Sequence, residues 1–222
     1  MPFIGVQPAS ALLTSADIQD GQITTAKIAD DAVGNTKLDL TANYAFTGTV
    51  SGTGMALLLD ATISSAVSEY DISSTHINST YDAYYLDASL RPDTDDAVPY
   101  MRPFVSGSVV TSGISYETYG IDNDKIVGDN TAYIRLSRTG LGNAEGEGLT
   151  INGHLQNINS TTVPFCFSGL VNSYQSDNTH KGSIATGGLI VSSRASVVNG
   201  LRLYFSSGNI TSGTVKLYGL RT

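Results

Sequence analysis

Apolar and polar residues alternate strictly in three segments of the C-terminal half of the chain. In LTINGHLQN (149–157), the apolar positions are Leu149, Ile151, Gly153 and Leu155. LRLYFSS (201–207) and TVKLYGL (214–220) follow the same pattern. Because successive side chains of a strand point to opposite faces, this alternation predicts strands with one buried and one wet face. Such strands are typical of antiparallel sheets.

Eight further segments have the composition of short strands. They are 55–63, 66–73, 82–90, 98–108, 114–120, 131–138, 163–172 and 184–192. Turn-forming stretches separate them, namely RPDTDD, DNDKIVGDN, GLGNAEGEG, SDNTHKG and SSGNITSG. About ten short strands at this spacing, without helical periodicity, predict an all-β head domain over residues 55–222. We expect an antiparallel β-sandwich of the jelly-roll type.

A different period marks residues 16–54, which we interpret as a shaft and a linker. Apolar side chains recur there at every fifth residue: Ile18, Ile23, Ile28, Val33 and Leu38. A strand would place successive members on opposite faces, and a helix would separate them by about 140°. One chain therefore cannot bury this row against itself. The alternatives are a solenoid that turns at each pentad, a disordered tether, and three chains wound about one axis. Since five pentads are too few for a stacked solenoid, we expect a trimeric shaft.

We interpret residues 1–15 as an arm with an apolar tip. The apolar residues are Pro2, Phe3, Ile4 and Val6, and Pro8 follows them. The prolines disfavour helix, so we expect an extended arm that inserts into a partner protein.

Composition and charge exclude several classes of protein. Only 14% of the residues are charged, against the usual quarter, and the net charge is -8. An acidic surface repels phosphate backbones, which argues against nucleic-acid binding. No apolar run approaches the roughly 18 residues of a membrane span, so we expect no membrane insertion. The N-terminus lacks a basic region and an apolar core, and we expect no signal peptide.

The metal-binding and thiol-bearing residue types are sparse. His76, His154 and His180 have no second His or Cys at ligand spacing, so we expect no metal site of the zinc type. We place His154 on the polar face of its strand and His180 in a turn. The single cysteine, Cys166, is expected to be a buried free thiol.

The acidic residues offer two further hypotheses. The run Asp93, Asp95 and Asp96 could hold Ca²⁺ or form a solvated turn, and the preference of Asp for turns favours the second. Two carboxylate pairs are neighbours in sequence only: Asp82 with Asp87, and Glu145 with Glu147. Nothing pairs an acid with a base in a recognisable pocket, so we expect no catalytic residue, no cofactor and no enzymatic activity.

Tyrosines are numerous, with 12 in the chain and no tryptophan. A tyrosine offers an apolar ring and a hydroxyl to glycans or protein surfaces. Tyr116, Tyr119, Tyr174 and Tyr204 could be exposed and are our candidate receptor-binding residues. The alternative is that most tyrosines are half-buried on sheet faces or in subunit contacts.

Three segments of the chain together resemble one family. MPFIGVQPA (1–9) followed by DIQDGQITTAKIADDAVGNTKL (17–38) is similar to the N-termini of tail-fibre and accessory virion proteins of marine bacteriophages, including cyanophages. The Tyr-rich segment with its Arg-Pro turn (79–119) resembles their head domains, and GLRLYFSSGNITSGTVKLYGLRT (200–222) resembles their closing hairpin.

This resemblance implies a homotrimeric virion appendage. The arm would attach it to another virion protein, of tail or capsid, and the jelly-roll head would face a host-surface glycan or protein. The leading expectation is a short tail fibre that acts in host attachment. The alternatives are a capsid decoration protein and, less favoured, a polysaccharide-degrading tailspike.

Overall fold

Antiparallel strands form the head domain, as the alternation of apolar and polar residues predicts. The computed structural model describes residues 54–120, 124–177, 179–190 and 196–220. The predicted arm (1–15) and the five apolar shaft positions lie outside the described residues. The described residues contain no helix, and their strands are β1 (Met55–Ile63), β2 (Glu69–Ile72), β3 (Ala83–Pro92), β4 (Pro99–Val105), β5 (Ser108–Val109), β6 (Ile114–Gly120), β7 (Lys125–Thr131), β8 (Ile134–Arg135), β9 (Gly148–Gln156), β10 (Cys166–Tyr174), β11 (His180–Leu189), β12 (Val198–Phe205) and β13 (Ile210–Leu220).

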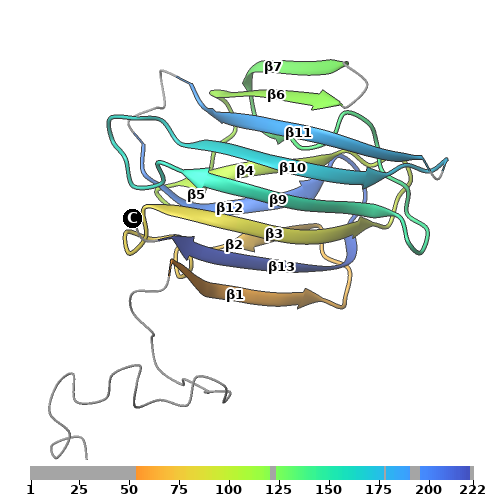
Figure 1. The fold of residues 1–222 in the computed structure, drawn as a ribbon, viewed down its shortest axis with the longest axis horizontal. Helices are drawn as coiled ribbons and strands as arrows, with labels where there is room; N and C mark the ends of the chain where they lie inside the picture. The colour runs from red at the N-terminus through yellow and green to blue at the C-terminus, as the bar shows by residue number, and fades with distance from the viewer. Residues whose placement is uncertain (1–53, 121–123, 178, 191–195, 221–222) are drawn as a thin grey trace, which may run out of the picture. The chain divides into compact units, whose positions relative to one another are not determined.

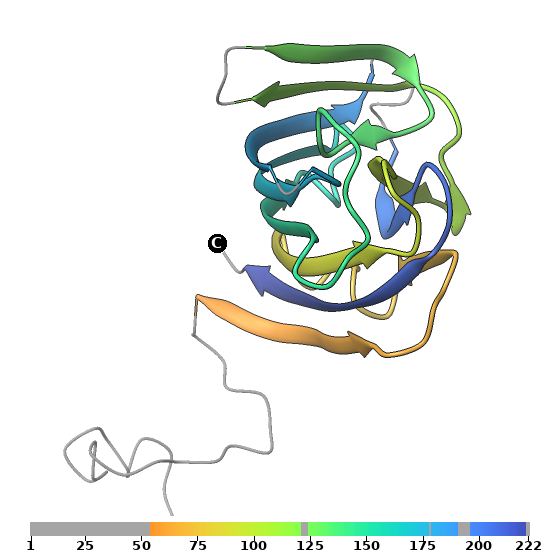
Figure 2. The same ribbon diagram turned by 90° about the vertical axis from the view of Figure 1, so that its right-hand side faces the viewer.

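Two sheets lie face to face (Figures 1 and 2). The larger has eight strands in the order β1-β13-β3-β9-β10-β11-β6-β7, and the smaller has the order β2-β12-β4-β5, with β8 also paired to β4. Apolar side chains from both inner faces meet between the sheets, among them Leu86, Ile151 and Phe167 of the larger sheet and Met101 and Leu203 of the smaller. This is the two-layer packing of a β-sandwich.

The strand order confirms the jelly roll. If the eight basic strands are numbered along the chain, a jelly roll has sheets ordered 1-8-3-6 and 2-7-4-5. Here β1-β13-β3-β9 and β2-β12-β4-β5 reproduce those two orders. The fifth strand is divided in two, because β5 pairs with Phe104 and Val105 of β4 while β8 pairs with Tyr100 and Met101.

Two inserted hairpins widen the larger sheet. The β6–β7 hairpin lies between the two halves of the fifth basic strand, and β10–β11 lies between β9 and β12. Both add to the same edge, beyond β9, so four strands extend the sheet in one direction (Figure 1). The result is an outer face much broader than the smaller sheet behind it.

Some strand limits differ from the sequence prediction. The segment DNDKIVGDN was predicted as a turn, but Lys125–Thr131 forms β7, an edge strand paired with β6. An edge strand contacts the core weakly, so only Ile126 of this strand packs against it and the alternation is poor. The segment predicted at 184–192 begins earlier, at His180, so the placement of His180 in a turn was wrong. The segment predicted at 131–138 contains only the two-residue strand β8.

Candidate binding face

The outer face of the eight-stranded sheet presents its side chains in rows that run across the strands. Figure 1 looks onto this face. The antiparallel register brings outward residues of neighbouring strands opposite one another, where cross-strand pairs interact. The face divides into an apolar part on the inserted strands and a polar and aromatic part on the jelly-roll strands β9, β3 and β13.

The apolar part consists of three large side chains in register. Tyr119 of β6 lies opposite Ile184 of β11, which lies opposite Leu170 of β10. Their exposed fractions are 43%, 53% and 59%. We call Tyr119, Ile184 and Leu170 the apolar patch. Contiguous exposed apolar side chains of this size mark interaction surfaces more often than single ones do.

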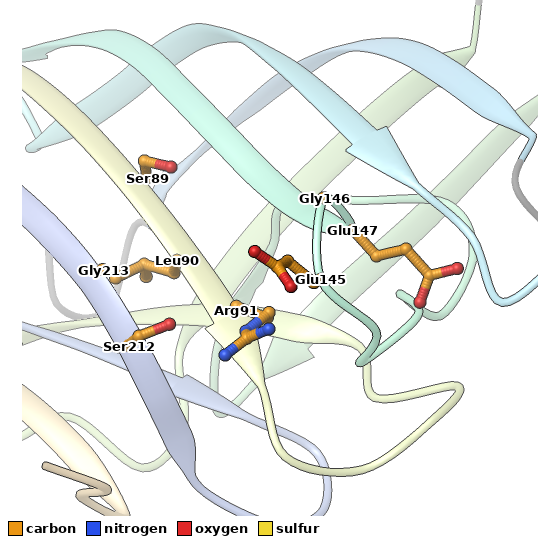
Figure 3. A pocket seen from close by; sticks show the side chains of 8 residues that line it. All are labelled: Ser89, Leu90, Arg91, Glu145, Gly146, Glu147, Ser212 and Gly213. Carbon is orange, nitrogen blue, oxygen red and sulfur yellow. The ribbon is translucent and has the colours of Figure 1, made fainter. Parts of the chain in front are cut away.

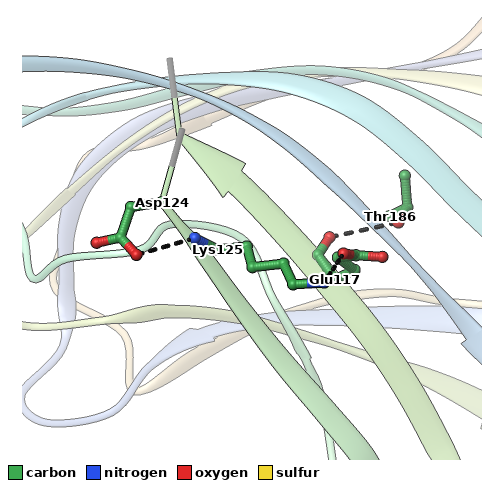
Figure 4. Close-up of polar contacts among 4 residues, drawn as sticks. All are labelled: Glu117, Asp124, Lys125 and Thr186. Atoms are coloured by element: carbon green, nitrogen blue, oxygen red, sulfur yellow. Dashed lines mark hydrogen bonds and ion pairs between the residues drawn. The ribbon is translucent and has the colours of Figure 1, made fainter. Parts of the chain in front are cut away.

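Charged residues border the apolar patch on the side of β7. Lys125 Nζ lies 3.2 Å from Glu117 Oε1 and 5.9 Å from the centroid of the Tyr119 ring. The backbone N–H of Lys125 donates to Asp124 Oδ1, and Thr186 Oγ1 donates to the backbone oxygen of Glu117 (Figure 4). The border therefore carries charges of both signs.

Aromatic rings form a row on the jelly-roll half of the face. His154 of β9 lies opposite Tyr85 of β3, which lies opposite Tyr218 of β13. The ring centroids of Tyr85 are 5.2 Å from His154 and 6.2 Å from Tyr218, at interplanar angles of 59° and 49°. We call His154, Tyr85 and Tyr218 the aromatic row.

A polar row lies beside the aromatic row. Asn152, Asp87 and Lys216 occupy the next outward positions of the same three strands and are paired in register. Asn152 Nδ2 donates to Asp87 Oδ1 at 3.1 Å, and Lys216 Nζ lies 3.8 Å from Asp60 Oδ2 of β1. These contacts hold the amide and the carboxylate side by side.

A depression of about 540 Å³ lies at the far end of the same strands. Ser89, Leu90 and Arg91 of β3, Ser212 and Gly213 of β13, and the loop 145–147 line it (Figure 3). Within the described residues, the Arg91 Nε is buried and has no hydrogen-bond partner. Most buried polar atoms are paired, so this nitrogen is an exception.

The two rows and the depression lie on one continuous surface. Tyr85, Asp87, Ser89 and Arg91 alternate with buried residues along β3 and so share its outer face. Arg91 follows Tyr85 by six residue steps along the strand, a length of about 20 Å. We call the aromatic row, the polar row and the depression together the outer strip.

The structure separates the four tyrosines chosen from the sequence. Tyr119 and Tyr174 are exposed, at 43% and 44%, but the expected exposure of Tyr116 was wrong, because its ring is only 8% exposed and packs beneath Gly128. Tyr204 is half-buried on the smaller sheet. Tyr174 contacts His180, with ring centroids 5.0 Å apart. The four side chains therefore do not converge on one site.

Tyr204 belongs to an aromatic and arginine cluster on the other side of the domain. Its ring is 5.5 Å from that of Tyr100, which stacks on Tyr133 at 4.0 Å, and the Arg102 guanidinium lies 4.7 Å from the Tyr204 ring centroid. Burial raises the pKa of Tyr204 to about 12, although the positive charge of Arg102 acts in the opposite direction.

The partial burial of Tyr204 should make the stability of the domain depend on pH in the alkaline range. Its pKa in the folded chain, about 12, lies above the ordinary value of 10, so the unfolded chain loses this proton first. Its contribution to stability is complete below pH 10 and is lost as pH rises toward 12. In urea unfolding between pH 9 and 11.5, Tyr204→Phe should reduce the loss of stability with pH. An unchanged slope would contradict the assignment.

The turn that contains Asp93, Asp95 and Asp96 is hydrogen-bonded to neighbouring loops. Asp93 accepts hydrogen bonds from the backbone and side-chain nitrogens of Asn209, both at 2.8 Å, and these bonds lower the pKa of its carboxyl. Asp95 accepts from the backbone N–H of Asn143, and Asp96 accepts from the Ser176 hydroxyl. In the part of the chain that the structure describes, no three His, Cys, Asp or Glu side chains are arranged to hold a metal ion.

The remaining candidate residues have ordinary environments. His154 lies on the polar face of β9, as predicted. Cys166 is partly rather than fully buried, desolvation raises the pKa of its thiol, and its Sγ donates to Gln156 Oε1 at 3.5 Å. None of the described segments forms a helix long and apolar enough to cross a membrane.

Comparisons with known proteins give this chain no relative. No protein-family model matches it, and the searches of curated proteins and of solved structures found no match.

Proposed function

We propose that this chain is a structural protein of a bacteriophage virion, a homotrimeric short tail fibre or fibre-like appendage without enzymatic activity. Its arm (Pro2, Phe3, Ile4 and Val6) would attach to another virion protein, and its jelly-roll head would contact the host surface. The resemblance of residues 1–38, 79–119 and 200–222 to marine phage fibre proteins supports this function. A jelly-roll head in residues 55–220 is compatible with it.

The observation that carries the proposal is the broad outer face of the larger sheet. Both inserted hairpins extend that face, and together they supply the apolar patch. In a homotrimer, the patch of one chain would contact a neighbouring chain. Burying a large apolar side chain contributes about 1.5–3 kcal/mol, less here because each is already half covered. The two signs of charge at Lys125 and Glu117 would allow pairing across the contact.

A single charge in the apolar patch should weaken the trimer. Leu170→Asp places a carboxylate where burial is expected, which should raise the dissociation constant at least about tenfold. Light scattering after size-exclusion chromatography, over a range of protein concentrations, measures this. Asn172→Asp adds the same charge two residues along the same outward face of β10 and serves as the control.

The location of the protein in the particle tests the function itself. A map of the virion should place three-fold density for this chain at the tail. Density on the capsomers would instead identify a capsid decoration protein. A chain that is monomeric at micromolar concentration and also in the particle would refute the appendage, and release of oligosaccharides from host glycan would refute the absence of catalysis.

A further inference from the structure

The outer strip combines two kinds of surface that sugar rings require. A pyranose has apolar C–H faces that pack on aromatic rings and hydroxyls that both donate and accept hydrogen bonds. Tyr85 is central in the aromatic row, and the tilted rings of His154 and Tyr218 flank it. One sugar ring can therefore stack on Tyr85 while the neighbouring rings contact its edges.

The polar row supplies both donors and acceptors next to that ring. Asn152 and Asp87 are already hydrogen-bonded to each other, and Lys216 is held near Asp60. Side chains fixed before binding lose little conformational freedom when a ligand arrives. An amide, a carboxylate and an ammonium group match hydroxyls better than they match an apolar protein segment.

The depression offers a second binding point for the same ligand. Its volume of about 540 Å³ lies within the range of small-molecule sites. Arg91 and Glu145 line it together with Ser89 and Ser212, which carry hydroxyls (Figure 3). Arg91 lines the depression, and its guanidinium group is a hydrogen-bond donor suited to ligand hydroxyls. Since the depression continues the polar row along β3, one extended ligand can occupy both.

The charge of the outer strip selects among glycans. The outer strip contains two cations, Arg91 and Lys216. It contains or adjoins four carboxylates, which are Asp60, Asp87, Glu145 and Glu147. Carboxylates are in excess, and the whole chain has a net charge of -8. Uronic acids and sulfated sugars would be repelled.

We propose that the outer strip binds a neutral oligosaccharide, with one sugar ring stacked on Tyr85 and the remaining units running along β3 to Arg91. The inference rests on the proposed function, because a host-attachment head meets surface glycans. It assigns the receptor site to Tyr85 and Tyr218 rather than to the tyrosines chosen from the sequence. The apolar patch remains available for contacts between chains.

Calorimetric titration of the full chain tests the proposal. The probes are neutral hexasaccharides of glucose, mannose and galactose units, with hexagalacturonate as the acidic counterpart. At least one neutral probe should bind, and hexagalacturonate should not. Tyr85→Ala should weaken binding about tenfold or more, as expected for loss of a stacked ring. Tyr174→Ala removes an exposed tyrosine of the same face that lies outside both the outer strip and the apolar patch, and it should have no effect.

A second variant tests the outer strip by a substitution in a loop, which leaves the strands of the sheet unchanged. Glu145 is exposed in a loop, so Glu145→Arg should fold normally and should increase binding of hexagalacturonate relative to the wild type. The proposal is overturned if no neutral probe binds, if the wild type prefers hexagalacturonate, or if Tyr174→Ala weakens binding as much as Tyr85→Ala.

The test of the glycan site can fail independently of the test of the proposed virion appendage. A trimer found at the phage tail that binds none of the probes would refute the glycan site alone. A chain that binds a neutral probe but is absent from the particle would refute the appendage alone.

Discussion

Replacing Phe167 by alanine should lower the free energy of unfolding by about 3–5 kcal/mol. The ring is 1% exposed and lies over Gly153 and Gly169, which are directly paired between β9 and β10. A Cβ on Gly169 would lie 2.7 Å from the ring and 2.9 Å from the Asn152 carbonyl oxygen. The two glycines therefore make the space that the ring fills. Neither can fill that space when the ring is removed, so a cavity should remain.

The converse substitution should also destabilise the domain. In Gly153→Ala the new methyl group meets the Phe167 ring, and overpacking of this kind costs about 1–3 kcal/mol. The double variant Gly153→Ala/Phe167→Ala should lose less than the sum of the two, because the methyl group then enters the vacated space. Urea unfolding measures all three, and Ser168→Ala, outward on the same strand, should stay within about 0.5 kcal/mol of the wild type. Strict additivity would contradict the packing argument.

The strands of the jelly roll could be predicted where alternation was complete. β9, β12 and β13 bury the residues that the pattern marked, such as Ile151, Leu203 and Leu217. The inserted hairpin β6–β7 was not predicted as a hairpin, because β7 is an edge strand with little contact to the core. Of its turn-forming residues, Gly128 pairs with Tyr116, whereas Asp129 and Asn130 lie in a β-bulge where Asn130 has a positive φ of 52°, so a local turn preference is accommodated within the strand.

The candidate site could not be predicted, because it depends on which strands pair and in which register, and the sequence alone does not give that pairing. Tyr85 and Tyr218 are far apart in the chain and meet only because β3 and β13 are neighbours in the sheet. Tyr116 is a different case. Tyr116 lies two residues after Ile114 in β6, so the alternation of the strand already placed both side chains on the inward face and Tyr119 on the outward face. The partial burial of Tyr204 depended on the packing of Tyr100 and Arg102, which no local pattern indicates.

Loss of one hydroxyl in Tyr84→Phe should destabilise the domain by about 1–3 kcal/mol. The Tyr84 side chain is fully buried, and its Oη accepts from the backbone N–H of Asn78 at 2.8 Å and donates to the carbonyl of the same residue at 2.6 Å. These bonds fasten the loop between β2 and β3, in which Ile77 is also fully buried. Tyr85→Phe, on the outward side of the same strand, is the matched control and should change stability by less than about 0.5 kcal/mol.

A second substitution distinguishes the lost hydrogen bonds from a general loss of packing. Asn159 Nδ2 also donates to the Asn78 carbonyl, at 3.2 Å, so in Tyr84→Phe that oxygen keeps a partner while the N–H loses its own. In the double variant Tyr84→Phe/Asn159→Ala the carbonyl is left unpaired as well. Unfolding free energies should therefore show a loss greater than the sum of the single losses, because either donor alone can satisfy this oxygen. Hydrogen exchange in residues 73–82 should be faster in the double variant than in either single variant. A loss of packing alone would instead give additive losses of stability and would leave exchange in that loop no faster than in the rest of the sheet.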